Sequence, residues 1–248
     1  MELKCLPDGG WLLGPLAVCG STVLLVAHAT ARPVSAAGVV LFAAGVVAAY
    51  ALDHWVDLPP ARRSPLFLYI TGLAALTGLM ACLWLPGWKI ALATALGVVG
   101  LSYRSWKKWP LVKTLLIAGA WTAAGVGLPI AWDTRDLFFA SFGGALFALF
   151  AADALLCDFK DGAADARAGV RTAVVLWGRR TAAIVAAGLA MGGVIAALAA
   201  GRPGLAAAGL MLAGLAAFPN LISRPVLGPA LVDGALVLPA VLILAGLA

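Results

Sequence analysis

Three aspartates in a charged stretch at positions 158–172 are the side chains best suited to bind a cation. The stretch reads Asp-Phe-Lys-Asp-Gly-Ala-Ala-Asp-Ala-Arg-Ala-Gly-Val-Arg-Thr, and Asp158, Asp161 and Asp165 stand at spacings of three and four. In a helix these spacings put the three carboxylates on one face. Crowded carboxylates repel one another unless a cation lies between them, and Mg²⁺ prefers oxygen ligands. The spacing therefore predicts a magnesium site.

A second acidic pair, Asp53 and Asp57, stands at a spacing of four much earlier in the chain. The pair ends an apolar run, where the dipole of a helix C-terminus disfavours anions. A purely structural role there would favour a cation, so the two carboxylates indicate function. Whether they join the later aspartates depends on the helices that carry them.

The composition is that of a membrane protein. The chain has 248 residues, of which 63% are hydrophobic and 11% charged, and its mean hydropathy is +1.03. Roughly 20 apolar residues cross a hydrocarbon core, so the chain has room for about nine spans. Strand-like alternation is absent, and open strands cannot cross lipid. We expect an all-α, polytopic bundle of nine transmembrane helices in the lipid bilayer, forming a single domain over residues 1–248.

Apolar runs and their breakers set the expected spans. They lie at 11–30, 34–56, 65–86, 87–103, 109–132, 136–157, 180–200, 204–221 and 227–247.

The basic residues give the orientation of these spans. Of the 17 Lys and Arg, only Arg32, Lys89, Arg135 and Arg202 fall on one side, and the other 13 fall on the side of the N-terminus. This bias predicts a cytoplasmic N-terminus in a multi-pass plasma membrane protein, and the Ala and Gly content suggests a bacterial source. Both acidic sites then face the cytoplasm. Because the cations are spread between apolar runs, nucleic-acid binding is not expected.

Acidic helix ends with Lys and Arg nearby predict a phosphorylated substrate. Magnesium shares its ligands readily with phosphate, and basic side chains hold the same anion. The carrier of the phosphates must be apolar, since membrane helices line the pocket. An isoprenyl diphosphate meets both demands, whereas a nucleotide would need a soluble recognition domain.

The motifs resemble those of the UbiA superfamily of intramembrane prenyltransferases. Asp158-x-x-Asp161-x-x-x-Asp165-x-x-x-Gly169-x-x-Thr172, followed by Gly178, is similar to the second aspartate motif of that family. Asp53-x-x-x-Asp57 resembles the later half of its first motif, and Tyr103-x-x-x-Lys107 resembles its Tyr-x-x-x-Lys element. Where the first motif begins with Asn-Asp, this chain has Ala49-Tyr50.

The resemblance implies a nine-helix bundle and a role for each matching residue. Magnesium, the expected cofactor, would be held by Asp53, Asp57, Asp158, Asp161 and Asp165. The diphosphate would be bound by Arg63, Tyr103, Lys107 and Arg171. Catalysis would be mainly electrostatic, with no protein nucleophile.

Other polar residues are weaker candidates. Tyr50, His54 and Asp153 are possible pocket residues, because Tyr50 and His54 flank the first motif and Asp153 is an ionisable group within a span. Asp233 and the four cysteines, Cys5, Cys19, Cys82 and Cys157, are expected to be structural.

Four functions remain open. The favoured one is transfer of a prenyl group to an unidentified acceptor. A terpene cyclase of the same family would use no acceptor, and the shortened first motif is compatible with it. A cation carrier and a non-catalytic relative are the other readings. No protein partner is indicated.

Overall fold

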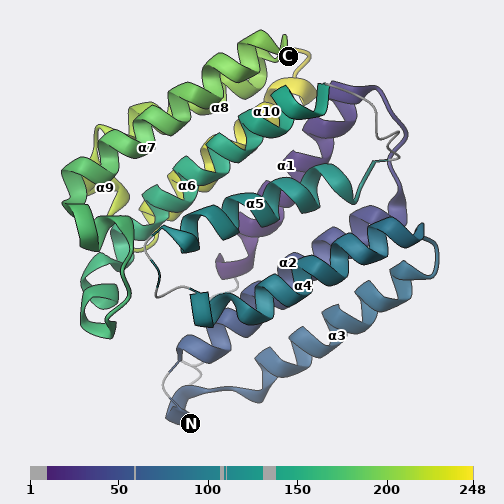
Figure 1. Ribbon diagram of the computed structural model, residues 1–248, viewed down its shortest axis with the longest axis horizontal. Coiled ribbons are helices and arrows are strands. Elements are labelled where there is room, and N and C mark those ends of the chain that lie inside the picture. The colour runs from purple at the N-terminus through teal and green to yellow at the C-terminus, as the bar shows by residue number, and fades with distance from the viewer. Residues whose placement is uncertain (1–9, 59, 107–108, 110, 131–137, 248) are drawn as a thin grey trace.

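The computed structural model describes residues 10–58, 60–106, 109, 111–130 and 138–247, and within them the chain is helical (Figure 1). A short 3-10 turn, η1 (Pro60–Arg62), joins the second and third helices. The α-helices are α1 (Gly10–Thr30), α2 (Ala36–Asp57), α3 (Pro65–Cys82), α4 (Gly87–Trp106), α5 (Val112–Gly127), α6 (Phe138–Ala168), α7 (Ala173–Ala199), α8 (Pro203–Ala216), α9 (Pro219–Ile222) and α10 (Leu227–Leu244).

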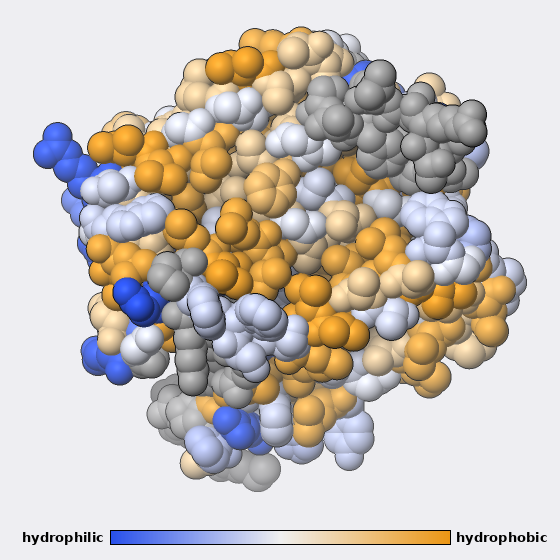
Figure 2. Space-filling model, viewed as in Figure 1, coloured by the Kyte–Doolittle hydropathy of each residue, from blue (hydrophilic) through white to orange (hydrophobic). Residues whose placement is uncertain are grey.

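Six of these helices are long and apolar enough to cross a membrane, namely α1, α2, α3, α6, α7 and α10. Three more, α4, α5 and α8, are apolar but shorter. Figure 2 shows that apolar residues cover much of the visible face, while strongly hydrophilic ones gather at its left and lower left edge. The all-helical class predicted from composition is confirmed for the described residues, and the six long apolar helices are compatible with the predicted membrane protein.

The helices form a ring with one helix outside it. In order around the ring, neighbours pack as α1, α2, α4, α5, α6, α7, α8 and α10, and α10 returns to α1. The remaining long helix, α3, packs along α2 at the lower right of Figure 1. The ends of α2, α4 and α6 and the starts of α3, α5 and α7 all lie toward the lower left of that view. The two acidic sites are therefore on one side of the bundle.

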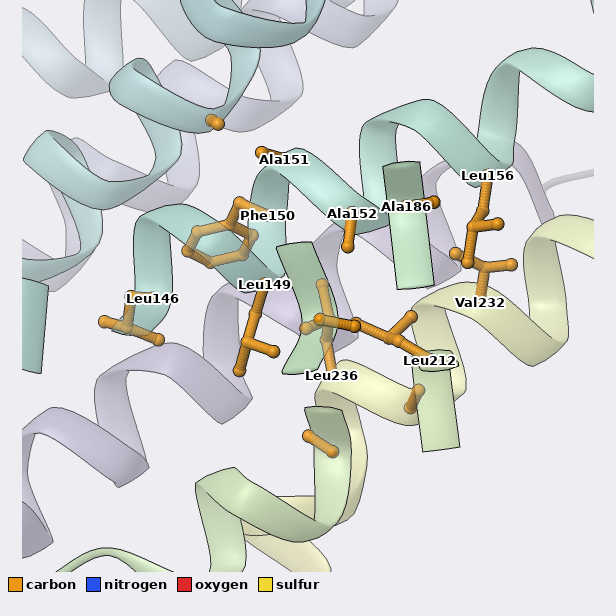
Figure 3. Packing of buried hydrophobic residues seen from close by; sticks show 14 of the residues in the cluster. Leu146, Leu149, Phe150, Ala151, Ala152, Leu156, Ala186, Leu212, Val232 and Leu236 are labelled. Atoms are coloured by element: carbon orange, nitrogen blue, oxygen red, sulfur yellow. The ribbon is translucent and has the colours of Figure 1, made fainter. Parts of the chain in front are cut away.

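The centre of the packing is α6, which is the most buried of the six long apolar helices. Its apolar side chains meet α7, α8 and α10 in one cluster (Figure 3). Leu156 of α6 and Val232 of α10, both fully buried, point toward one another there. This contact fixes α10 against the half of α6 that leads to the acidic end.

Small residues bring α6, α7 and α8 close together. A Cβ at Gly193 would lie 2.7 Å from Leu149 Cδ2, and one at Gly209 would lie 2.6 Å from Val194 Cγ2. Only glycine permits such contacts, as is usual where membrane helices pack tightly. Gly192, in the same glycine-rich run, has open space beside it, so only part of that run serves packing.

The prediction that the sixth span ends at 157 and the seventh begins at 180 was wrong. One unbroken helix of 31 residues continues through the charged stretch to Ala168. It ends at Gly169, whose φ of 70° is left-handed, and the N–H of Val170 donates to the carbonyl of Asp165 at 2.9 Å. This pattern closes a helix and favours glycine. The next helix, α7, then starts at Ala173 and breaks at Gly178, where φ is 76° and ψ is 162°.

The other predicted spans match α1 to α5, α8 and α10 within a few residues, with three notable differences. The third span stops at Cys82 rather than 86, and the fifth stops at Gly127 rather than 132. The predicted eighth span is split, since α8 ends at Ala216 and the separate turn of α9 begins at Pro219. Proline lacks the N–H that would have continued the helix.

Candidate functional site

The last turns of α6 carry the three aspartates of the second motif. Because α6 is continuous there, Asp158, Asp161 and Asp165 lie on one side of it, and the two later charges act directly on Asp158. Asp158 is buried, with 2% of its surface exposed, whereas Asp161 and Asp165 are half-buried. Asp161 and Asp165 can therefore be reached by a ligand from outside the bundle, whereas Asp158 is buried in the packing.

The buried carboxylate is paired with Lys113, near the start of α5. Lys113 Nζ donates to Asp158 Oδ1 at 2.5 Å, and the side chains are 22% and 3% exposed. A buried carboxylate needs such a partner, because desolvation of an unpaired charge is costly. Sequence analysis placed Lys113 on the correct side but did not single it out. The only indication of Lys113 in the sequence is its predicted place on the same side as the aspartates. The pairing itself depends on how α5 packs against α6.

The acidic end of α2 carries the first-motif residues. Tyr50, Asp53 and Asp57 stand at positions i, i+3 and i+7, which share a helix face. Tyr50 interacts electrostatically with Asp153 and Cys157 of α6, so the Tyr50 end of this face lies near α6. Asp53 is exposed, and the side chain of Asp57 lies outside the part that the structure describes.

His54 and Arg63 are both held by structural contacts. The His54 ring packs on Phe67 of α3, with centroids 4.8 Å apart. Arg63 donates from Nε to the carbonyl of Leu58 and from Nη2 to that of Val56, each at 3.1 Å, and its guanidinium lies 4.9 Å from the centre of the Trp55 ring. Arg63 therefore caps the acidic end of α2, where the last carbonyls of the helix lack partners.

The remaining predicted diphosphate ligands are less fully described. Lys107 lies outside the described residues, and Tyr103 is in the last turns of α4 with its side chain outside them. Arg171 is exposed in the short connection between α6 and α7. That connection follows directly on the acidic turns of α6.

A third polar group lies deeper in the bundle. Asp153 and Cys157 of α6 and Asp233 of α10 bring one ligand atom each within 4.8 Å of the others, and Tyr50 of α2 and Trp121 of α5 lie beside them. Sequence analysis named Asp153 and Tyr50 as pocket residues but assigned Cys157 and Asp233 to packing. The spacing of four between Asp153 and Cys157 was visible in the sequence, whereas the approach of α10 was not.

The donors at the end of α6 suit a hard cation. All three are carboxylates, two are reachable from outside, and the turn spacing lets neighbouring carboxylates share one ion. Mg²⁺ is bound in this way, through one or two carboxylates together with water and phosphate oxygens. The residues present therefore fit magnesium.

Comparison of the chain with known protein families, curated proteins and solved structures finds no match.

Proposed function

We propose that this protein is an intramembrane enzyme that ionises an isoprenyl diphosphate with magnesium and transfers the prenyl group to an acceptor. The observation that carries the proposal is the acidic end of α6, where Asp161 and Asp165 stand half-buried above the paired Asp158 and Lys113. Two features support it: the likeness of this segment to an aspartate motif of the UbiA superfamily, and the position of α2 with its own aspartates on the same side of the bundle.

In this proposal each residue at the end of α6 has one task. Asp161 and Asp165 hold the cation, with Asp53 and Asp57 of α2 completing its ligands from the facing helix. When bound, magnesium neutralises the charge that builds on the leaving diphosphate. Lys113 holds Asp158 in place through their ion pair, and Arg63 holds the end of α2 that carries Asp53 and Asp57. The reaction would take place at the cytoplasmic face of a plasma membrane.

The prenyl chain would lie inside the bundle, against an aromatic wall. Trp121 of α5 is flanked by Phe42 of α2 and Phe150 of α6, each with its ring centroid 5.6 Å from that of Trp121. Aromatic faces stabilise cations and exclude water, both of which an allylic cation needs. The wall begins next to Tyr50, one turn below Asp53.

The same aromatic wall also supports a second candidate function, which is cyclisation of the prenyl chain without an acceptor. Tyr50 stands where the UbiA motif has an aspartate, and it interacts electrostatically with Asp153, Asp233 and Cys157. An aromatic ring at that place would stabilise a migrating positive charge better than it would bind a polar acceptor.

The test uses the purified full chain in lipid nanodiscs with prenyl diphosphates of several lengths. We expect diphosphate release that requires Mg²⁺ and is abolished by Asp161→Asn, with no change in the unfolding temperature. The control is Asp136→Asn, which removes a carboxylate that the sequence puts at the opposite membrane face and that lies outside the described residues. Full activity of Asp161→Asn would refute the metal assignment. Release of terpene without acceptor would decide for the cyclase, and release only with lipid or quinone precursors would decide for transfer.

A further inference from the structure

The interior group of α6 and α10 is a second candidate site, separate from the acidic end of α6. It consists of Asp153, Cys157 and Asp233, whose ligand atoms all lie within 4.8 Å of one another. Asp153 and Cys157 share a face of α6 because they are four residues apart. Asp233 reaches the same place from α10, so two helices far apart in sequence supply the group.

One carboxylate oxygen of this group is buried without a hydrogen bond in the described part of the chain. Asp153 Oδ1 is fully buried and makes no hydrogen bond to any residue that the structure describes. A buried polar atom without a partner costs about 1–3 kcal/mol, and more if it is charged. Native proteins rarely leave such an atom unsatisfied unless a ligand, water or ion binds it.

The basic groups nearby do not satisfy this carboxylate. Lys160 acts electrostatically on Cys157 and Asp233, but its side chain is exposed and stands about two turns along α6 from Asp153. From α2 the group faces Tyr50, which carries no positive charge. Two carboxylates and a thiol thus face one another in the bundle, and they need either a shared proton or a cation.

The backbone of α1 is adapted to the group. A Cβ at Gly14 would lie 2.1 Å from Asp233 Oδ2, so a larger residue at that position would force the carboxylate to move. The close approach holds Asp233 between α1 and α6. Its carboxylate therefore lies against α1 on one side and close to Asp153 and Cys157 of α6 on the other.

We propose that Asp153, Cys157 and Asp233 bind a divalent transition-metal ion of the Zn²⁺ class. Thiolate and carboxylate together suit Zn²⁺ rather than Mg²⁺, which takes oxygen ligands alone. Zn²⁺ lies about 2.3 Å from sulfur and about 2.0–2.2 Å from carboxylate oxygen, so three donors within 4.8 Å converge on one ion with small side-chain rotations.

The ion in the interior is distinct from the proposed magnesium. Cys157 and Asp161 are four residues apart on α6, about 6 Å at the usual rise, and Asp153 lies about 12 Å from Asp161. No ligand is shared between the sites. The proposal accordingly does not depend on prenyl chemistry and can be tested without any diphosphate.

The experiment titrates the metal-stripped, reduced full chain in detergent with Co²⁺, followed by competition with Zn²⁺. We expect one Co²⁺ per chain with a thiolate-to-cobalt charge-transfer band, displaced by Zn²⁺. Cys157→Ser should abolish the band, and Asp153→Asn and Asp233→Asn should each weaken binding at least about tenfold. Cys82→Ser, which removes another partly exposed cysteine, and Asp161→Asn should both retain the band.

Two outcomes would overturn the proposal. One is a reduced parent protein that shows no band and retains no Zn²⁺, which would mean that the carboxylates share a proton instead. The other is a band that persists in Cys157→Ser. Thermal unfolding guards against misfolded variants: Zn²⁺ should raise the unfolding temperature of the parent and of Cys82→Ser but not that of Cys157→Ser. A uniform rise in all three would also refute the site.

Discussion

The pair of Lys113 and Asp158 makes a quantitative prediction about how α5 is held against α6. Lys113→Met keeps most of the side-chain volume but leaves the Asp158 carboxylate, 3% exposed, without its partner at 2.5 Å. Removing one member of a buried ion pair costs about 3–5 kcal/mol. Because the Lys113 side chain is 22% exposed, water already screens part of the attraction, and we expect a loss of about 3 kcal/mol.

The assay is thermal unfolding of the purified protein in detergent, read as a double-mutant cycle. A loss of about 3 kcal/mol lowers the unfolding temperature by about 6–12 °C in a chain of this size. In the Asp158→Asn background the buried charge is gone, so Lys113→Met should then cost only about 1 kcal/mol. The control is Arg180→Met, which removes an exposed cation at the start of α7 and should change stability by less than about 0.5 kcal/mol. Equal losses in both backgrounds, or a Lys113→Met variant as stable as the control, would refute the pairing.

Two further predictions concern glycines. Gly209→Ala places a methyl group 2.6 Å from Val194 Cγ2 and 3.0 Å from the carbonyl oxygen of Ala190, so it should destabilise the protein by about 1–3 kcal/mol. Gly192→Ala meets open space and should be neutral or stabilising by up to about 1 kcal/mol, and equal unfolding temperatures would contradict the packing. Gly178→Ala must adopt a backbone conformation that is nearly exclusive to glycine and should cost about 1–3 kcal/mol, again read from thermal unfolding. An unchanged unfolding temperature would show that the break in α7 is not strained.

The helices could largely be read from the sequence because the bilayer demands long apolar runs. Pro65 and Gly87 mark the starts of α3 and α4 where the apolar pattern predicted them. The extension of α6 was missed, because its charges look like a loop while its alanines favour a helix. Only the closing hydrogen bond at Gly169 shows where that helix ends.

The candidate site was predictable in its residues but not in its pairings. Spacing along one chain indicates which side chains share a helix face, and in this way Asp158, Asp161 and Asp165 were found. The residues that approach α6 come from other helices: Lys113 of α5 pairs with Asp158, and Asp233 of α10 lies close to Asp153. Such contacts depend on helix packing and on residues like Gly14, whose lack of a side chain leaves room for the Asp233 carboxylate.

The length of α6 determines the depth in a bilayer at which a substrate would bind. Its 31 residues span about 46 Å, whereas a bilayer's hydrocarbon layer is about 30 Å thick. An α6 that crosses a membrane upright would extend beyond the hydrocarbon, and its acidic last turns would then lie among the lipid headgroups. A diphosphate on a prenyl tail is anchored at that same level. In the proposed function, enzyme and substrate would meet by diffusion within the plane of the membrane, and the prenyl tail would never have to enter water.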